Sequence, residues 1–182
     1  MTDNKKTPEK RLTAEESTRT VFLQEMRSVV YDHQGSAFIK FINLAIGIEY
    51  LGAFWDNNDF MEEGLSEKRF NKALKKLFPK KYQRFSKSGN EFYLYKQFRC
   101  PFVHQLRPGK KVVVTHRAES QKEGTTHLEP TKNGFLVLVL EDFFDDFESA
   151  CNKLFDFEKK KKLPSKKLKQ DYLVFRSIRD NE

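Results

Sequence analysis

The chain has 182 residues, 33% of them charged and 38% hydrophobic, and its formal net charge is +8. This length suits one domain with a substantial core and is too short for two. The longest apolar segment, residues 37–55, contains Lys40, Asn43 and Glu49, so we expect a buried core helix rather than a membrane span. Only two cysteines occur, without a CxxC pair, and no apolar run follows a basic start, which predicts a reduced, cytoplasmic setting.

Charge is unevenly distributed along the chain. Residues 66–90 hold nine lysines and arginines against one glutamate, and residues 159–182 hold nine against three acids. Residues 56–63 and 141–148 are acidic instead. Separate basic and acidic surfaces favour a polyanionic partner, self-association or both, whereas a lysine-rich solvated surface is the ordinary alternative for any single run.

The first third of the chain is expected to form a tail and two helices. Residues 1–17 are polar and charged with almost no apolar periodicity, so we expect them to be disordered. Residues 18–30 carry apolar side chains at helical spacing, and so do residues 37–55, for which Ser36 is a suitable cap. The second of these helices should be central, because its apolar stripe is wide.

Two more helices are predicted in the middle of the chain. After Ser66, residues 67–78 place an apolar stripe beneath a lysine-rich face, and Pro79 ends the pattern. A polar turn leads to residues 92–106, where a further helical pattern stops at a Pro-Gly pair. The first of these helices is expected on the surface and the second in the core.

A β-hairpin and the last core helix are predicted next. Two runs of β-branched or apolar residues flank a polar loop, a pattern typical of a hairpin, near residues 111–140. Asp142 is suited to cap the helix that follows. The predicted fold class is therefore mainly α, a compact helical bundle over residues 18–157 with the hairpin inserted before its last helix.

The remaining residues, 158–182, form a basic C-terminal segment that we expect to be partly ordered. A run of four lysines and Pro164 end the preceding helix. Residues 172–175 are apolar enough to dock on the core, and the pattern allows either a helix or a strand.

The most informative motif is Arg99-Cys-Pro-Phe-Val-His104, within the predicted helix 92–106. Arginine is a permanent cation and histidine titrates near neutrality, so the pair is suited to chemistry on a phosphate. On a straight helix five residues turn through roughly 500°, and the two side chains would leave about 140° apart. Because Pro101 lacks an N–H and clashes with the preceding turn, we expect a break or kink that turns both side chains toward one groove.

An arginine followed by four residues and a histidine, on a late helix of a helical core, resembles the signature of the HEPN superfamily. The resemblance implies a helical bundle and a homodimer in which the motif-bearing helices of two protomers face each other across a shared groove. In catalytic members this groove cleaves RNA without a metal ion or cofactor. In the implied reaction the RNA 2′-OH attacks the adjacent phosphate, His104 transfers protons, and Arg99 stabilises the phosphoryl charge.

The resemblance also implies a place in prokaryotic defence or stress response, with a cognate protein as a further expected partner. Catalytic members usually carry Asn, Asp or His directly after the arginine, whereas this chain has Cys100. A non-catalytic HEPN-like module that binds RNA or another polyanion is therefore an alternative. Leu106 occupies the position of a tyrosine in toxin-like members paired with nucleotidyltransferase antitoxins, so we do not infer that regulation.

Three residues are expected to support the pair: Glu49, Tyr95 and Cys100. Glu49 lies about 180° around its helix from Lys40, on the apolar side, where Arg99 would be a suitable counter-ion. A half-exposed position on the helix flank is the alternative for this glutamate. In a purely structural protein-interaction domain, pairing with Glu49 would be the whole role of Arg99. Tyr95, one turn before Arg99, would position the arginine, stack on a base, or only fill the core.

Basic residues near the motif and on the lysine-rich helix are candidates for nucleic-acid binding. These residues are Arg107, Lys110, Lys75, Lys76, Lys80 and Lys81. The first two would extend a phosphate-binding surface or satisfy a helix C-terminus. The other four lie among aromatic residues that would stack on single-stranded bases, and an ordinary amphipathic helix is the alternative. These aromatic residues are Phe70, Phe78, Tyr82 and Phe85.

No metal site or cofactor is predicted. His116 and His127 flank the predicted hairpin loop, and an acidic cluster follows, but their spacing is unlike that of zinc ligands. Surface histidines and a charged helix start explain these residues, the acids being Asp142, Asp145 and Asp146. The chain has no Gly-rich phosphate loop, GxSxG or HExxH motif, which excludes the most recognisable NTPase and hydrolase classes.

Overall fold

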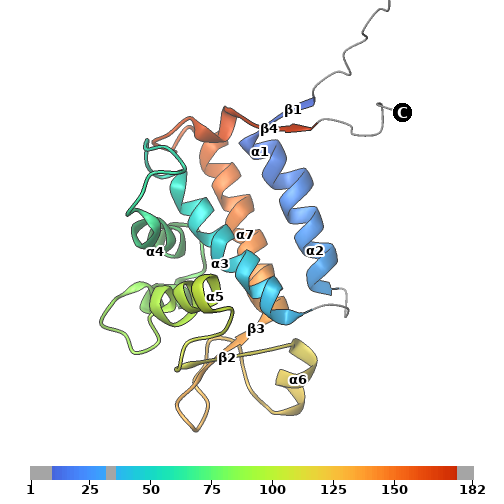
Figure 1. The fold of residues 1–182 in the computed structure, drawn as a ribbon, viewed down its shortest axis with the longest axis vertical. Coiled ribbons are helices and arrows are strands. Elements are labelled where there is room, and N and C mark those ends of the chain that lie inside the picture. Colours follow the sequence, from blue (N-terminus) through green and yellow to red (C-terminus); the bar gives the residue numbers. More distant parts are fainter. Residues whose placement is uncertain (1–9, 32–35, 176–182) are drawn as a thin grey trace, which may run out of the picture.

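The computed structural model describes residues 10–31 and 36–175 and is mainly helical, as predicted (Figure 1). In chain order the elements are β1 (Lys10–Thr13), α1 (Ala14–Ser17), η1 (Thr18–Phe22), α2 (Leu23–Tyr31), α3 (Ala37–Ala53), α4 (Ser66–Lys76), η2 (Lys80–Ser86), η3 (Tyr95–Arg99), α5 (Cys100–Gln105), β2 (Val112–Thr115), α6 (Arg117–Lys122), β3 (Leu136–Val139), α7 (Leu140–Lys159), η4 (Lys167–Lys169) and β4 (Asp171–Phe175). Here η1 and η3 are π-helical turns, and η2 and η4 are 3₁₀ turns. None of the described helices is long and apolar enough to cross a membrane.

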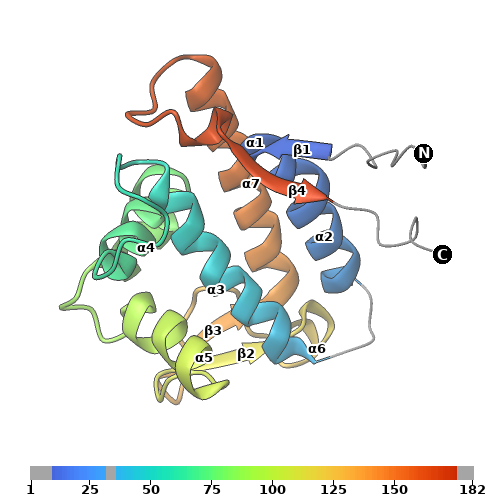
Figure 2. The same ribbon diagram turned by 45° about the horizontal axis from the view of Figure 1, so that its top comes forward.

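Helix α3 is the central helix, between α2 and α7 on one side and α4 and α5 on the other (Figures 1 and 2). Phenylalanine rings fill the space around it. The Phe41 ring of α3 lies 5.7 Å from that of Phe102 in α5, and Phe98 of η3 lies 5.1 Å from Phe143 of α7. Because a buried aromatic side chain contributes about 1.5–3 kcal/mol, these rings are the main source of cohesion between the helices.

Helices α3 and α4 cross closely at Gly52. A Cβ on this glycine would lie 1.8 Å from the backbone oxygen of Arg69, so a larger residue would push the helices apart. The close crossing brings the first turn of α4, including Ser66, toward the part of α3 that carries Glu49.

The predicted disordered tail is wrong for residues 10–17, which form β1 and α1. Thr13 and Glu16 make a capping box at the start of α1, in which the Glu16 backbone N–H donates to the Thr13 hydroxyl. Strand β1 pairs antiparallel with β4 at the other end of the chain. The strand has only four residues and its partner is distant in sequence, so the local sequence pattern does not predict it. Residues 1–9 of the predicted tail lie outside the described residues.

The predicted hairpin is also wrong, although its two strands exist. Strands β2 and β3 are neighbours but run parallel, because the chain between them crosses over through α6 (Figure 2). The antiparallel neighbour of β3 is instead the segment just before it, where the Leu128 N–H donates to the Val137 oxygen at 2.8 Å. The segment between Thr115 and Leu136 is long enough for a crossover connection. The apolar pattern of a strand does not show in which direction it pairs.

The helix starts differ from the predicted caps. Ser36 does occupy the cap position of α3, but its side chain makes no capping hydrogen bond. Ser66 is the first residue of α4, and Leu65 is its cap. Helix α7 begins at Leu140, so Asp142 belongs to its first turn, where a carboxylate favours the positive end of the helix dipole.

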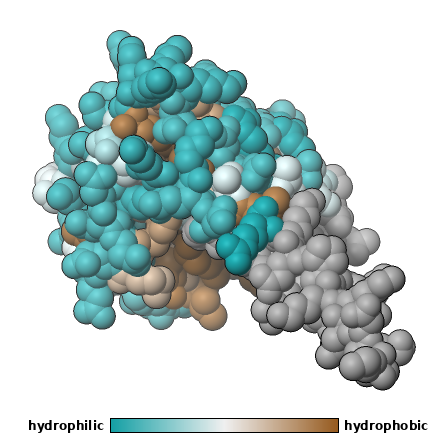
Figure 3. Space-filling model, turned by 90° about the horizontal axis from the view of Figure 1, so that it is seen from above, coloured by the Kyte–Doolittle hydropathy of each residue, from teal (hydrophilic) through white to brown (hydrophobic). Residues whose placement is uncertain are grey.

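The basic C-terminal segment is partly ordered in the part that the structure describes. Residues 172–175 belong to strand β4, and Lys167 in η4 is buried. The Lys167 ammonium donates to Asp56 at 3.1 Å, and Arg69 of α4 also pairs with Asp56, at 2.9 Å. Part of the basic charge is therefore internal. The surface at the β1 and β4 end is mostly hydrophilic, with smaller apolar areas (Figure 3).

Candidate functional site

The helix that carries the motif is continuous, which corrects the predicted break. The π-helical turn η3 leads directly into α5, and Pro101 is near the start of α5. In a regular α-helix the N–H at position 101 would donate to the Gln97 oxygen. That oxygen instead accepts the Gly109 N–H at 2.9 Å. The wide turn and this substitute donor accommodate the proline within a continuous helix.

The chain after α5 turns back onto η3. Helix α5 ends at Gln105, and its cap residue Leu106 has a φ of 55°, in the left-handed region. Gly109 then approaches Gln97 so closely that a Cβ would lie 2.7 Å from the Gln97 backbone oxygen. The close approach explains why glycine stands here. It also holds the loop with Arg107 and Lys110 against the motif-bearing helix.

Arg99 and His104 come together despite the five-residue spacing. The Arg99 Nη1 lies 3.4 Å from the His104 Nε2. Because a guanidinium only donates, the histidine nitrogen is the acceptor in this contact. His104 is exposed, and the Arg99 side chain is only 12% exposed. The length of the arginine side chain makes up for the angle between the two positions on the helix.

Glu49 of α3 completes the cluster. Its Oε2 accepts a hydrogen bond from the Arg99 Nε at 2.8 Å and lies 2.6 Å from the Arg99 Nη2 in the same ion pair. The glutamate side chain is 21% exposed, so the pair is largely shielded from water. A shielded, charge-assisted contact of this kind fixes the orientation of the guanidinium. The predicted pairing of Glu49 with Arg99 is confirmed as a contact.

Tyr95 and Ser66 lie around the same guanidinium. The Arg99 Cζ is 5.6 Å from the centre of the Tyr95 ring, and the Ser66 Oγ is 3.5 Å from the Arg99 Nη2. Burial and the neighbouring Cys100 thiol raise the pKa of Tyr95, so its phenol stays protonated at neutral pH. Tyr95 therefore touches the arginine face, one of the roles expected for it. Sequence reasoning missed Ser66, which it placed only as the residue before the predicted helix 67–78.

The cluster offers a fixed cation, an exposed imidazole and a carboxylate that orients the cation. We call Glu49, Arg99 and His104 the motif cluster. This arrangement suits stabilisation of charge on a phosphate together with proton transfer. Within residues 10–31 and 36–175, no group of three or more His, Cys, Asp or Glu side chains is arranged to hold a metal ion.

The predicted nucleic-acid-binding residues fall into two groups. Lys75, Lys76 and Lys80 are exposed on α4 and η2, and Lys110 is exposed in the loop after α5. Lys81 and Arg107 are exposed as well, but they have polar protein partners. The Lys81 ammonium pairs with Asp146 at 2.7 Å, and the Arg107 Nε donates to Gln105 at 3.1 Å.

The aromatic residues that were expected to stack on bases are internal. Phe70, Phe78, Tyr82 and Phe85 are all buried in the core. The amphipathic-helix alternative therefore holds for these positions, and the base-stacking prediction is wrong. The basic surface of α4 and η2 is charged without aromatic platforms from these four side chains.

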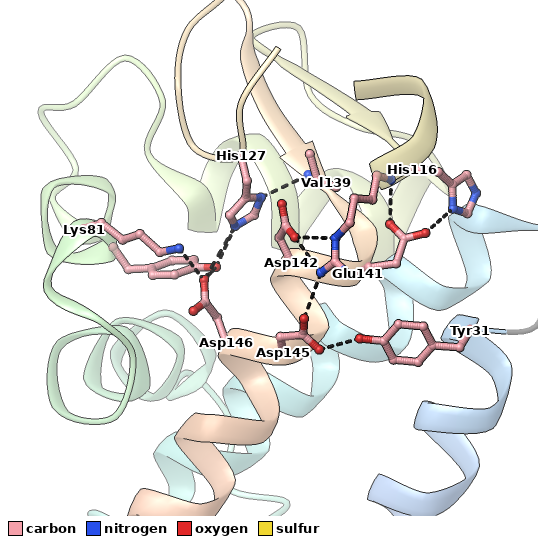
Figure 4. A network of polar contacts seen from close by, with 11 residues as sticks. Tyr31, Lys81, His116, His127, Val139, Glu141, Asp142, Asp145 and Asp146 are labelled. Atoms are coloured by element: carbon pink, nitrogen blue, oxygen red, sulfur yellow. Dashed lines mark hydrogen bonds and ion pairs between the residues drawn. The ribbon is translucent and has the colours of Figure 1, made fainter. Parts of the chain in front are cut away.

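A polar network ties α6 to α7 (Figure 4). The Arg117 side chain donates to Asp142 at 2.6 Å and to Asp145 at 2.8 Å, and the Tyr31 hydroxyl donates to Asp145. These contacts raise the pKa of Arg117 above its ordinary value. Glu141 accepts the Arg117 backbone N–H at 2.8 Å, at the start of α6. These acids act as counter-ions of Arg117 and as a cap at the start of α6.

His127 is buried, although the sequence predicted a surface histidine. Its Nδ1 accepts the Val139 N–H at 3.0 Å, and its Nε2 lies 2.8 Å from the Tyr82 hydroxyl (Figure 4). Tyr82 in turn donates to Asp146 at 2.9 Å. Burial, with a smaller contribution from the Lys81 charge, lowers the pKa of His127 to about 4. This histidine is a neutral structural bridge between η2, β3 and α7.

Comparison of the chain with protein-family models, with curated proteins and with solved structures gives no match. A function for this chain is therefore inferred from the geometry of the motif cluster and from the resemblance of the motif.

Proposed function

We propose that this protein is a HEPN-like protein that acts on RNA and cleaves it without a metal ion, with Arg99 and His104 as catalytic residues. One observation carries the proposal. His104 of the motif and Glu49, from a different helix, both lie within 3.4 Å of the Arg99 guanidinium. On a straight helix, two residues five positions apart would point to different faces.

The proposed reaction needs only these side chains and the RNA. The 2′-OH oxygen forms a bond to the adjacent phosphorus as its proton leaves to a base, and the bond from phosphorus to the 5′ oxygen breaks as that oxygen takes a proton. The products are a 2′,3′-cyclic phosphate and a free 5′-hydroxyl. His104 exchanges the protons, Arg99 stabilises the phosphoryl oxygens, and Glu49 holds the guanidinium in place.

A homodimer belongs to the proposal because the reaction uses an acid and a base, and each motif cluster contains one histidine. A second copy, facing the first, would supply the other His104. Exposed apolar side chains near the motif support such an association. Leu106, two residues after His104, is 67% exposed, and Phe38 and Ile39 at the start of α3 are 42% and 59% exposed.

The cellular setting is also part of the proposal. The resemblance implies a prokaryotic defence or stress response in the cytoplasm, with RNA as the target and a cognate protein as partner. The net charge of +8 supports a polyanionic target.

Cleavage of RNA in excess EDTA tests this function. We expect cleavage by the wild-type chain, with 2′,3′-cyclic phosphate ends, and at least a 100-fold loss in Arg99→Ala and in His104→Ala. A 2′-deoxynucleotide at the cut site should block cleavage there. Arg11→Ala is the control, since Arg11 is exposed on β1, away from the motif cluster (Figure 1). Cleavage that survives both motif substitutions would rule out this site.

A non-catalytic module is the second candidate, and Cys100 favours it. The thiol follows Arg99 at the position where catalytic HEPN members usually carry a hydrogen-bonding Asn, Asp or His, and it offers weaker hydrogen bonds. The partial burial of Arg99 against Glu49 also suits a structural ion pair. RNA binding that weakens steeply with salt, with no cleavage under any condition, would select this candidate.

A further inference from the structure

A pocket of about 260 Å³ lies where η1 and α2 pack against α3 (Figures 1 and 2). Each of its two long walls is one helical turn, with lining residues at positions i, i+1 and i+4, which share a face of a helix. The residues of these walls are Val21, Phe22 and Glu25 on one side and Ile46, Gly47 and Tyr50 on the other.

The hydroxyl groups of Thr18 and Tyr50, which line one end of the pocket, form a directed chain of hydrogen bonds. The Thr18 hydroxyl donates to the Ala14 backbone oxygen at 2.7 Å. Its single proton is thereby used, so Tyr50 is the donor in the 3.1 Å contact between the two hydroxyls. The Tyr50 hydroxyl has given its proton to Thr18, and its oxygen can only accept a hydrogen bond from a molecule in the pocket.

Glu25 is a second acceptor in the pocket wall. The two acids of α1, Glu15 and Glu16, have partners in the protein, including the Arg19 guanidinium at 3.0 Å from Glu15. Glu25 makes no hydrogen bond or ion pair with any residue that the structure describes. It follows Thr18 by seven positions, roughly 10 Å along the helix axis. The carboxylate and the Tyr50 oxygen therefore belong to opposite ends of the pocket.

The wall between the two acceptors is apolar. Val21 and Phe22 form it on one side, and Ile46, whose side chain is 48% exposed, forms it on the other. A cavity of about 150 Å³ can hold a benzene molecule, so this pocket has room for one ring and a short chain. Pockets with an apolar lining and a few converging polar groups are typical of small-molecule sites.

We propose that this pocket binds a small organic amine, with an ammonium group at one end of an apolar body and a second hydrogen-bond donor at the other. The ammonium pairs with Glu25, the donor reaches the Tyr50 oxygen, and the apolar body covers Phe22 and Ile46. Charge complementarity selects a cation, because an anion would meet acceptors at both ends of the pocket. The proposal is independent of the proposed function, since it uses neither Arg99 nor His104.

Tyramine is the probe, because it carries an ammonium group and a phenolic hydroxyl at opposite ends of one ring. Two compounds of nearly the same size each lack one feature: tyrosol has a neutral hydroxyl in place of the ammonium, and phenethylamine lacks the phenolic hydroxyl. Titration of the full chain, followed by amide NMR spectra, gives the dissociation constants and the positions of the affected residues.

Tyramine should bind with a dissociation constant below about 1 mM and shift the amide signals of the pocket walls. We expect tyrosol to bind about tenfold more weakly, since it lacks the charge that pairs with Glu25. Phenethylamine should bind about fivefold more weakly, because it cannot donate to Tyr50.

Two variants assign these contacts to their residues. Glu25→Gln should weaken tyramine about tenfold and leave tyrosol unchanged, whereas Tyr50→Phe should weaken tyramine about fivefold and leave phenethylamine unchanged. A general defect in folding would weaken all three compounds. Glu63→Gln is the control for net charge, because this exposed glutamate is in the loop between α3 and α4 and does not line the pocket.

Unaltered amide signals of the pocket at millimolar tyramine would overturn the proposal. Equal binding of tyramine and tyrosol would do so too, since the carboxylate would then select nothing. An equal loss in Glu25→Gln and Glu63→Gln would show attraction by net charge rather than by this site. Shifts of the same amides on raising the protein concentration without a probe would assign the pocket to a second copy of the chain instead.

Discussion

Glu49 and Arg99 are 50 positions apart in the chain, and the carboxylate Oε2 of one lies 2.6 Å from the guanidinium Nη2 of the other. The contact joins α3 to the motif-bearing helix. Both side chains are mostly shielded from water, so each depends on the other for its charge to be compensated. The same contact orients the cation of the motif cluster, and therefore stability and function are linked at Arg99.

Substitution of the two motif residues should separate these effects. Arg99→Ala leaves the Glu49 carboxylate without its cation and should lower the free energy of unfolding by about 1–3 kcal/mol. His104→Ala removes an exposed side chain and should change it by less than about 0.5 kcal/mol. Urea denaturation measures both. An equal loss of stability in the two variants would contradict the assigned roles, and Glu49→Gln combined with Arg99→Ala should recover part of the loss.

Gly109→Ala should loosen the loop that packs on the motif-bearing helix. The new Cβ would lie 2.7 Å from the Gln97 oxygen, so the Gly109 hydrogen bond to that oxygen must lengthen. We expect a loss of about 1–3 kcal/mol in the free energy of unfolding. Gly89→Ala is the control, because a Cβ there meets no atom within 4 Å. Thermal melting of the two variants compares them, and equal melting temperatures would show that the close approach is unimportant.

The His127 bridge should make the fold sensitive to mild acid. Burial lowers the pKa of His127 from 6.5 to about 4, so the folded chain resists protonation of a group that the unfolded chain protonates readily. The stabilisation is complete above about pH 6.5 and is lost as pH falls toward 4. Between pH 7 and 5 the free energy of unfolding should fall by about 2 kcal/mol.

Urea denaturation at these two pH values measures that fall, and His127→Gln provides the reference. The variant starts less stable because it loses the bridge between the Val139 N–H and the Tyr82 hydroxyl. Between pH 7 and 5 the free energy of unfolding of the variant should fall by about 2 kcal/mol less than that of the wild type, since glutamine does not titrate. An identical pH dependence in both chains would mean that other groups cause the effect.

Leu106 should report on association of two copies. Its backbone is in the left-handed region, where glycine is relaxed, and its side chain is 67% exposed. Leu106→Gly should therefore raise the stability of the isolated protomer by about 1 kcal/mol while weakening self-association. Sedimentation velocity across micromolar concentrations measures association. Met61→Gly, at another exposed apolar side chain, should leave association unchanged.

The two cysteines should differ in reactivity. Cys151 is fully buried in α7, and burial raises the pKa of its thiol well above the ordinary value, whereas Cys100 is partly exposed. A thiol reagent such as DTNB should therefore modify one thiol in the folded chain and two in urea. Cys100→Ser should abolish the native reaction. Rapid modification of both thiols without denaturant would show that α7 opens readily.

Local patterns were sufficient for most of the helices. The apolar spacing of α3, α4 and α7 identified their buried faces, because a helix repeats its contacts every three to four residues. The same reasoning failed for β1, whose partner β4 is at the other end of the chain. It also failed for the direction of β2 and β3, since strand direction depends on the path of the chain between them.

For the site, the sequence by itself determined which residue types are available: an arginine and a histidine five positions apart, with Glu49 as a candidate counter-ion. Only the tertiary structure decided that they meet, because the Gly109 hydrogen bond supports the proline-containing turn and the α3 contact orients Arg99. It likewise decided that the aromatic residues near the lysines are buried. Periodicity shows that a side chain faces inward, but distances between remote segments depend on how the whole core packs.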